Sequence, residues 1–478
     1  MTSDLLIPAL LITPLLFGIV GFVFQKKSTL WGLGFGTVFL LLSSGLLYGV
    51  STHTLDTYHF GGFVPPLGIA FEALPFGSLI LALSALILLV VFIYAAVSLT
   101  HAQAVLFYPL GAFLALGFVV IYLSRDIFNI YVGLEILGLS AVGLSALQNS
   151  SKSIHAALIY LFASLVASGL YLLGVTILYA KYALLDISSL SLVAQNDLTT
   201  LVAFGFIVTA FLIKTAVFPF SFWLPDAHAN ALSPVSALLS ALVIKATFYL
   251  LYLFATTLFP FAETIYIVLG SLGMVAIFYG GVKALLATDL KVLIAYSTVS
   301  QVGYLMVVFA FTHAYAYYAM VFALLSHALA KSGLFLAGGA IIRIAHTKTI
   351  SKLQGYASIT PVAVFAIGLS SVSLIGLPPS LGFVSKWYYL QSSFETSSWL
   401  FMGAILGGGI LSALYLFKLL ILFLQKPLED TESPKRPEDN DPLKTFSCKI
   451  LQWSAFSLSF LSVFLGFISH FIIDFLGS

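Results

Sequence analysis

The chain has 478 residues, of which 60% are hydrophobic and only 8% are charged, and its formal net charge is +2. Soluble domains carry about 25% charged residues, so this composition excludes a soluble protein and indicates one that spans a lipid bilayer. The single cysteine, Cys448, excludes a disulfide framework, a thiolate metal cluster and covalently attached haem, and no metal or cofactor is expected in the chain. A chain without a basic cluster is also not expected to bind nucleic acid.

Fourteen apolar segments follow one another along the chain, each near the length of about 20 residues that a membrane-spanning helix needs. They are 5–24, 30–50, 77–97, 105–123, 127–147, 154–179, 200–224, 231–258, 264–282, 292–310, 315–342, 362–389, 399–424 and 450–471. The first lacks a basic leader and a cleavage site, so we expect a retained helix rather than a signal peptide. Because polar and apolar residues do not alternate, a membrane β-barrel is excluded. The expected fold is an all-α integral membrane protein with about fourteen transmembrane helices.

Lysine and arginine are distributed unevenly between the two sides that this topology defines. The loops on the side of the termini hold only Arg125 and Lys181, and the opposite loops hold thirteen. These thirteen are Lys26, Lys27, Lys152, Lys283, Lys291, Arg343, Lys348, Lys352, Lys426, Lys435, Arg436, Lys444 and Lys449. By the positive-inside rule, both termini are expected on the outer side of a prokaryotic plasma membrane. The charged, proline-rich segment 425–449 is then a cytoplasmic loop.

Five lysines lie inside apolar segments, where inserting one charge costs at least about 2.5–3.5 kcal/mol. They are Lys214, Lys245, Lys331, Lys386 and Lys418. Only one acid, Glu135, lies comparably deep, so the lysines cannot all belong to closed ion pairs. Because burial favours the neutral form of a lysine, such residues can lose and regain a proton near neutral pH, as lateral proton transfer requires. Glu135 is the expected partner that holds or releases a proton on a nearby lysine.

The five lysines differ in how well a purely structural role explains them. Lys214 and Lys245 lie far from a helix end, so snorkelling to the interface does not account for them. Lys418 lies near a predicted helix end and could snorkel, so its role stays open. His327 and Lys331 are four residues apart on one helix face, which suggests a proton relay. A histidine that packs on a neighbouring carbonyl is the alternative.

Two of the lysine-bearing segments contain proline at mid-span. Pro219 follows Lys214, and Pro378 and Pro379 precede Lys386. Proline bends or interrupts a helix, and irregular backbone within a bilayer is tolerated only where it lines protein or a wet cavity. We therefore expect two broken helices whose lysines have a route to water. A packing kink would explain the prolines but not the charges beside them.

The chain also shows signs of an internal repeat. Lys214 and Lys245 are 31 residues apart, and Lys386 and Lys418 are 32 apart. The segments before the two broken ones carry nearly the same heptapeptide, SGLYLLG and SGLFLAG. Two five-helix units are expected, and an odd number of helices orients them oppositely, as in transporters with inverted repeats. The expected organisation is a three-helix segment (1–104), two five-helix repeats (105–258 and 259–424), the polar loop (425–449) and a C-terminal helix (450–478).

Several longer stretches together resemble one known family. They are SRDIFNIYVGLE at 124–135, KTAVFPFSFWLPDAH at 214–228, LSPVSALLSALVIK at 232–245, LIAYSTVSQVGY at 293–304 and the broken-helix lysine Lys386. In this combination the chain resembles, over nearly its whole length, the antiporter-like membrane subunits shared by respiratory complex I, membrane-bound hydrogenases and multi-subunit Mrp-type cation/proton antiporters. Within the family, the stretches DAH at 226–228 and SPVSALL at 233–239 are most similar to the D-type subunit of the Mrp antiporters and its hydrogenase relatives.

The resemblance implies a set of residues that carry protons along a buried axis. These are Glu135 paired with Lys214, then Lys245, His327, Lys331 and Lys386, with Lys418, Asp226 and His228 as secondary candidates. The expected function is proton translocation within a complex that exchanges protons for Na⁺ or another monovalent cation. Partners would be a homologous antiporter-like subunit and small helical subunits. Because no set of oxygen ligands for Na⁺ is visible, the cation path is expected in a partner.

Two alternatives remain open. The chain could form part of the membrane arm of a complex I-type NADH:quinone oxidoreductase or a membrane-bound hydrogenase, with the redox chemistry in other subunits. Lys386 disfavours the complex I subunit type that has glutamate at this position. The absence of a long lateral helix after the last span argues against the larger subunit types. A stand-alone carrier of an organic substrate is disfavoured by the excess of buried lysines.

Overall fold

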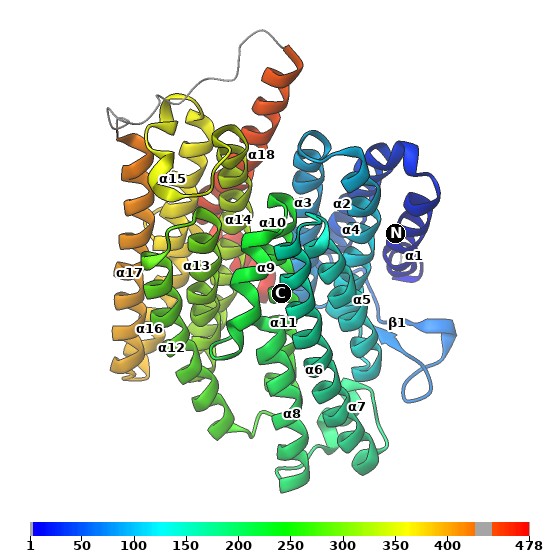
Figure 1. Cartoon of the computed structure of the whole chain (residues 1–478). Coiled ribbons are helices and arrows are strands. Elements are labelled where there is room, and N and C mark those ends of the chain that lie inside the picture. The colour runs from blue at the N-terminus through cyan, green and yellow to red at the C-terminus, as the bar shows by residue number, and fades with distance from the viewer. Residues whose placement is uncertain (1–2, 426–441, 478) are drawn as a thin grey trace.

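The computed structural model describes residues 3–425 and 442–477, and these are almost entirely helical (Figure 1). Thirteen helical segments of this part are long and apolar enough to cross a membrane. The remaining expected segment, 362–389, consists of two shorter helices, α15 (Pro361–Ile375) and α16 (Leu381–Glu395), which follow each other along the bundle. The expected all-α multi-pass membrane fold is therefore confirmed. The expected polar loop 425–449 falls largely outside the described residues.

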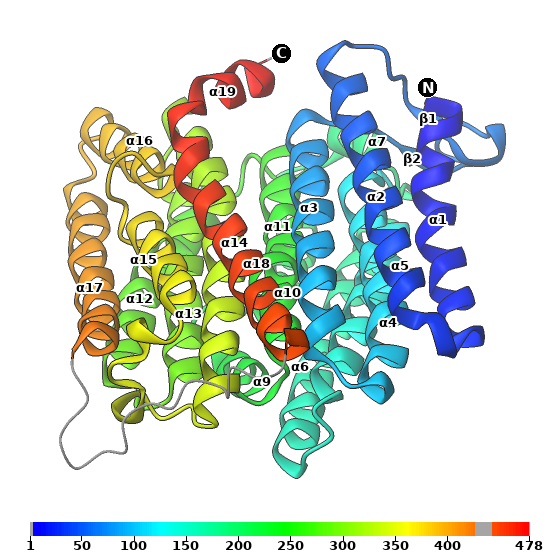
Figure 2. The ribbon, with the colours of Figure 1, turned by 90° about the horizontal axis from the view of Figure 1, so that it is seen from above.

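The other helices follow one another in three groups along the chain. The first group is α1 (Ser3–Val23), α2 (Ser28–Ser51), α3 (Pro75–Ser98), α4 (His101–Leu123), α5 (Ile127–Ala146), α6 (Ser151–Tyr182), α7 (Ile187–Val193) and α8 (Leu198–Thr215). The second group is α9 (Leu224–Asn230), α10 (Ser233–Leu238), a π-helical turn (Leu239–Val243), α11 (Ile244–Thr257), α12 (Glu263–Leu286), α13 (Leu290–Met306) and α14 (Ala314–Ala345). The last group is α17 (Trp399–Leu424), α18 (Pro442–Phe467) and α19 (Ser469–Gly477). Figure 2 shows the two termini at the same end of the bundle.

Three short elements lie outside the expected spans. The strands β1 (Tyr58–His59) and β2 (Ala70–Phe71) form an antiparallel hairpin between α2 and α3. The helices α7 and α19 are also too short to cross a bilayer, since a span needs about 20 residues. The hairpin and α7 connect successive spans, and α19 follows the last described span, α18.

Both proline-containing segments are interrupted, as predicted. After α8, Ala216 adopts a left-handed backbone conformation (φ 56°), and a 3₁₀ turn at 220–223 leads into α9. After α15, Gly376 is left-handed (φ 85°), and α16 begins at Leu381. A left-handed residue ends an α-helix, and a nearby proline prevents it from resuming at once. Each interruption thus leaves backbone N–H and C=O groups without helical hydrogen bonds inside the bundle.

A loop pairing recurs in the two halves of the chain, first at the start of α5. The side chain of Asp126 caps this helix by accepting hydrogen bonds from its first backbone N–H groups. The loop then pairs with the segment after α6: Ile127 N donates to Leu185 O (2.9 Å), and Ile187 N donates to Arg125 O (2.8 Å). This pairing lies at the end of the bundle that carries the termini.

The start of α13 has the same arrangement at the opposite end of the bundle. Asp289 caps the helix, Leu290 N donates to Lys348 O (2.8 Å), and Ile350 N donates to Thr288 O (2.9 Å). In both cases the loop before one helix pairs with the segment after the following helix. We propose on this ground that the two units 105–258 and 259–424 are inverted copies of one another.

Burial divides the spans into inner and outer helices. In the spans Ser233–Thr257 and Ala314–Ala345, 94% of the residues in an apolar stretch of 18 residues are buried. The corresponding share is 33% in Trp399–Leu424 and Phe446–Phe467. The two inner spans carry Lys245, His327 and Lys331. These three side chains therefore lie in the protein interior, far from lipid.

Candidate functional site

Lys214 and Glu135 form the first charged cluster, between α8, α5 and α6. Lys214 Nζ donates to Ser164 Oγ (3.0 Å) and lies 3.8 Å from Glu135 Oε1. Ser168 Oγ donates to the same carboxylate oxygen. The Lys214 side chain is 6% exposed and that of Glu135 is 24% exposed. Glu135 and Lys214 are therefore neighbours, as the resemblance implies, and the carboxylate is the more exposed of the two groups.

Lys245 lies in the next cluster, directly after the π-helical turn. Its Nζ donates to Ser240 O, within that turn. Ser240 and Thr298 share a hydroxyl hydrogen bond (2.9 Å), which joins the turn to α13. Thr215 and Thr247 share another (2.8 Å), which joins the end of α8 to α11. Lys245 is almost fully buried, so the Ser240 carbonyl replaces part of the water that its amine would otherwise bind.

Lys331 and His327 lie one turn apart on α14, in the centre of the bundle. Lys331 is completely buried, and its Nζ donates to Ile294 O (3.0 Å) and to Ser297 Oγ. Neither ring nitrogen of His327 has a hydrogen-bond partner among the described residues. The packing alternative requires a carbonyl partner for this histidine, and none is present in that part of the chain. Buried polar atoms of this kind are usually satisfied by water.

His228 and Asp226 occupy different environments although both lie on α9. His228 is completely buried, stacks on the Phe335 ring with 5.4 Å between centroids, and has no hydrogen-bond partner for either ring nitrogen among the described residues. Asp226 is exposed. Of the two secondary candidates on α9, the structure thus places only His228 in the buried interior, where Lys245 and Lys331 also lie.

Lys386 lies after the second interruption and is only half-buried. Its Nζ donates to Ile375 O (2.6 Å), the last residue of α15, and lies 4.8 Å from the centroid of the Tyr304 ring. An open pocket of about 310 Å³ lies beside it between α16 and α17, and includes Trp387 and Gly409. The lysine therefore has a carbonyl and an aromatic face as partners, but no carboxylate among the described residues.

Lys418 does not join these clusters. It is exposed on α17, and its Nζ donates to Leu285 O (3.0 Å) near the end of α12. A long side chain that reaches the carbonyls at a helix end corresponds to the snorkelling alternative.

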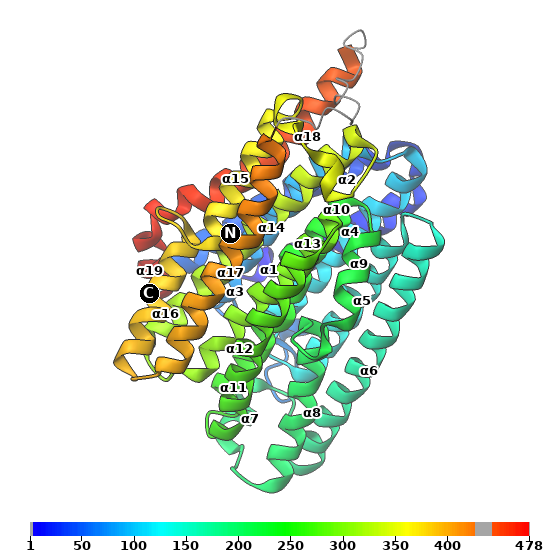
Figure 3. The same cartoon turned by 60° about the vertical axis from the view of Figure 1, so that its left-hand side comes forward.

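The clusters form a row that crosses the bundle from α5 to α16. In Figure 3, α5 and α6 lie on one flank and α16 and α17 on the other, with α13 and α14 between them. A hydroxyl pair between Ser326 and Ser373 (2.8 Å) links α14 to α15, next to the second interruption. Each amine of the row thus contacts a hydroxyl or carbonyl oxygen inside the bundle.

Sequence reasoning missed the hydroxyl partners and one buried cation. Ser164 and Ser168 lie four residues apart on a helix, a spacing that could have marked a polar face, but serines are common in membrane helices. Lys291, expected in a loop, lies in the first turn of α13, is buried, and donates to Ala231 O (2.6 Å). No local sequence signal distinguishes it from the exposed lysines on the same side.

The family described as NADH:quinone oxidoreductase/Mrp antiporter, TM, matches residues 124–412. NADH-quinone oxidoreductase subunit N of Desulforudis audaxviator is 34% identical over 373 residues, which cover 76% of this chain and 74% of that protein. The D subunit of the Na⁺/H⁺ antiporter of Bacillus subtilis is 28% identical over 449 residues, which cover 91% and 89%.

Solved structures share the fold at lower identity. A chain of the Mrp complex from Dietzia sp. superposes with a TM-score of 0.90 at 22% identity, covering 99% of this chain and 96% of that one. A chain of the archaeal membrane-bound sulfane sulfur reductase matches with a TM-score of 0.88 at 21% identity, covering 98% of this chain and 97% of that one. A chain of respiratory complex I from Thermus thermophilus matches with a TM-score of 0.76 at 22% identity, covering 98% of this chain and 99% of that one. The family match includes both interrupted helices and every charged cluster of the row, and the chain belongs to the NADH:quinone oxidoreductase/Mrp antiporter transmembrane family.

Proposed function

We propose that this chain translocates protons as the antiporter-like subunit of a multi-subunit membrane complex that exchanges a monovalent cation, Na⁺, for H⁺. The observation that carries the proposal is the row of amines that begins beside Glu135, with Lys214, Lys245 and Lys331 buried and Lys386 half-buried at its far end. A fold that needed only stability would not keep such largely uncompensated amines within the bundle, because each one is costly to bury.

The contacts suggest how a proton would move. Each amine holds a carbonyl or hydroxyl oxygen with part of its hydrogen-bonding capacity, so it can give up a proton without losing its position. Glu135 favours the charged form of Lys214 when the two approach, and a longer separation favours proton release. His327 lies one turn from Lys331 on α14, and His228 is buried on α9; the ring nitrogens of both have no partner among the described residues and would serve as the relay between Lys245 and Lys331.

We propose that the cation itself crosses in a partner subunit. Glu135 is the one carboxylate within the fourteen spans expected from the sequence, whereas a cation site needs several oxygen ligands that converge. The solved structures that share the fold come from multi-subunit complexes, which supports membrane subunits as partners. The partners proposed are a homologous antiporter-like subunit and small helical subunits.

For the location we propose a prokaryotic plasma membrane with both termini on the outer side. The support is the charge bias of the loops, thirteen lysines and arginines against two, together with termini at one end of the bundle. Fusing a reporter that is active on only one side of the membrane to each terminus tests this orientation. Cytoplasmic activity of either fusion would contradict it.

A second candidate is the membrane arm of a redox-driven proton pump. It is favoured by one observation, the 34% identity to a protein named NADH-quinone oxidoreductase subunit N. The same lysine row would serve in that setting, with the driving force supplied by redox chemistry in other subunits. The two candidates differ in what energises transport rather than in the path of the proton.

The deciding experiment uses inverted membrane vesicles that contain the complete native complex. A pH gradient is imposed without an electron donor, and Na⁺, K⁺ or Li⁺ is added. Dissipation of the gradient by one of these cations is the expected result, and it should vanish in vesicles with an assembled Lys214→Ala complex. No dissipation, with proton pumping only after a reductant such as NADH is added, would select the redox-driven alternative.

A further inference from the structure

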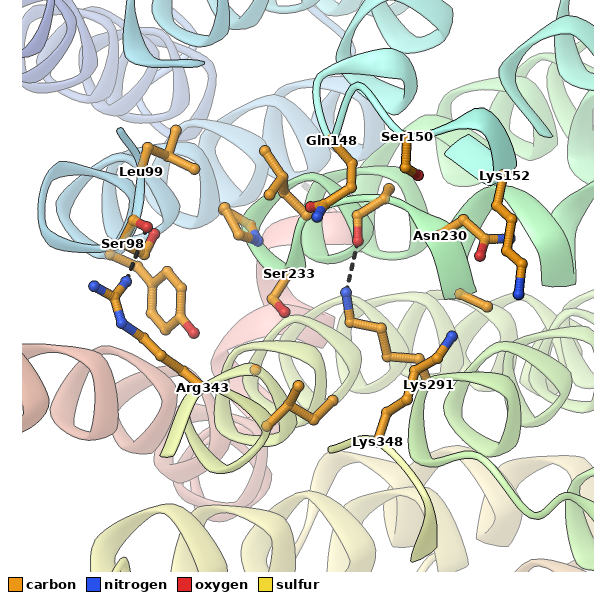
Figure 4. A pocket seen from close by; sticks show the side chains of 17 residues that line it. Ser98, Leu99, Gln148, Ser150, Lys152, Asn230, Ser233, Lys291, Arg343 and Lys348 are labelled. Carbon is orange, nitrogen blue, oxygen red and sulfur yellow. Dashed lines mark hydrogen bonds between the residues drawn. The ribbon is translucent and has the colours of Figure 1, made fainter. Parts of the chain in front are cut away.

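A second polar site lies at the end of the bundle opposite the termini. There, a pocket of about 480 Å³ opens between the ends of α3 and α14, the start of α6 and the turn that joins α9 to α10 (Figure 4). Four cations line it: Lys152, Lys291, Arg343 and Lys348. No acidic side chain is among the lining residues. Asp289 forms an ion pair with Lys348 (3.0 Å), and the other three cations have no ion-pair partner in the described part of the chain.

The pocket is equipped with hydrogen-bond donors that the protein does not use. Lys291 is buried, and its Nζ donates one hydrogen bond, to Ala231 O (2.6 Å). Arg343 Nη1 donates to Ser98 O (2.8 Å). Since an ammonium group carries three N–H donors and a guanidinium five, both keep donors for a ligand. The Ser98 hydroxyl is buried and has no partner among the described residues.

Three unpaired cations around one pocket repel one another and repel any incoming cation. The pocket is thus a poor entrance for H₃O⁺ or Na⁺, although it lies on the side where cations are most frequent in the loops. A bound anion would remove both penalties, because it compensates the buried charge of Lys291 and satisfies the free donors.

We propose that this pocket binds a phosphate group, carried by an anionic lipid headgroup or by free inorganic phosphate. Arginine and lysine around a tetrahedral anion can each donate to a different oxygen, and a guanidinium matches phosphate oxygens in pairs. Basic pockets between membrane helices at this level typically bind lipid headgroups. The apolar side chains of Leu99 and Ile342 in the wall of the pocket would suit the first part of an acyl chain.

The pocket adjoins the interior of the bundle along α9. Ala229, which lines the pocket, directly follows the buried His228. Binding itself does not depend on the proposed transport function and is tested without it.

The test measures binding to the purified complex in a neutral detergent in two separate arms. One arm uses radiolabelled inorganic phosphate, and the other a soluble short-chain phosphatidylglycerol. We expect saturable binding in at least one arm. The double variant Lys152→Gln/Arg343→Gln should weaken it about tenfold or more for each cation removed, because hydrogen bonds to ionised groups are the strong ones. Binding in the lipid arm alone assigns the site to a headgroup, and equal binding in both arms to free phosphate.

The matched control removes two cations from the same end of the bundle outside the pocket, Lys283→Gln/Lys352→Gln. Both residues are exposed, and the control should bind as the unmodified chain does. The Lys152→Gln/Arg343→Gln variant could lose binding only because it does not fold. A second double variant, Lys152→Arg/Arg343→Lys, preserves the charges and should retain binding. Absence of saturable binding in both arms, or an equal loss in the control pair, would overturn the proposal. Either result would leave the proton-translocation test in inverted vesicles unaffected.

Discussion

At the first interruption Lys214 lies two residues before the left-handed Ala216 and faces inward, whereas at the second Lys386 lies ten residues after the left-handed Gly376. The first lysine is enclosed by α5 and α6 and has a carboxylate, that of Glu135, 3.8 Å away. The second opens on a pocket beside α17 and has a backbone carbonyl and an aromatic ring. Two breaks of similar backbone geometry thus hold lysines of different accessibility and partner.

The different positions of the two lysines show that their sequence spacing alone does not make them counterparts. The intervals of 31 and 32 residues suggested that Lys214 and Lys386 are counterparts in the two units, but their positions relative to the left-handed residue are not equivalent. The equivalent loop pairings at Asp126 and Asp289 support the repeat better than the lysines do. If the proposed repeat holds, the backbone is repeated while the charges have been placed separately in each half.

The largest expected effect is at the enclosed break. Glu135→Ala and Lys214→Ala should each lower proton translocation at least about a hundredfold in assembled complex, the usual loss when a positioned proton-transfer group is removed. Because the two act on one proton, the double variant should be no worse than either single variant. The measurement is cation-dependent gradient dissipation, normalised to the amount of complex.

A matched ion pair provides the control for that result. Lys181 and Asp197 also form an ion pair, on the outside of the bundle, and Lys181→Ala should leave transport within about twofold, as is usual for surface substitutions. Normal transport by assembled Lys214→Ala and Glu135→Ala complexes would exclude the lysine row as the proton path.

Accessibility to a small thiol reagent would sharpen the comparison next. In a Cys448→Ser background, Lys386→Cys should react with N-ethylmaleimide more than about tenfold faster than Lys214→Cys, because labelling requires an accessible thiolate. The isolated chain in detergent is used, so that no neighbouring subunit covers the pocket. Equal labelling rates would mean that the two lysines do not differ in exposure and that the two breaks are equally accessible.

A smaller effect on transport is expected from substituting each of the two left-handed residues, Ala216 and Gly376, separately. A Cβ on Gly376 would lie 2.6 Å from Lys386 Cδ, so Gly376→Ala should displace that lysine and lower transport about tenfold, as small misplacements of reacting groups do. Ala216→Gly should instead relieve strain, since a left-handed alanine costs roughly 1–2 kcal/mol, part of which glycine loses again in the unfolded chain. Thermal unfolding and transport are measured on both variants. A transport loss with Ala216→Gly that is larger than with Gly376→Ala would contradict the expectation that Gly376 leaves room for Lys386.

Much of this molecule is encoded in local features of the chain, and the exceptions share a cause. The spans follow from apolar length, the breaks from proline, and the unusual residues from the penalty of placing lysine in lipid, so all three could be predicted. The π-helical turn before Lys245, the hydroxyl partners at Ser164 and Ser297, and the burial of Lys291 could not. Each depends on which helices become neighbours, and that is set by contacts between distant segments rather than by local pattern.

The smallest effect is expected at Lys418, where the sequence left a proton-carrying role open. Its amine is exposed and donates to Leu285 O at the end of α12, outside the row. Lys418→Ala should therefore change transport by less than about twofold, as is usual for an exposed side chain away from a site. Lys418→Arg, which keeps the charge and the contact with the carbonyl, is the control. A tenfold loss with alanine that arginine restores would extend the row to α17, and the second half would then carry a charged pair of helices, as the first half does with Lys214 and Lys245.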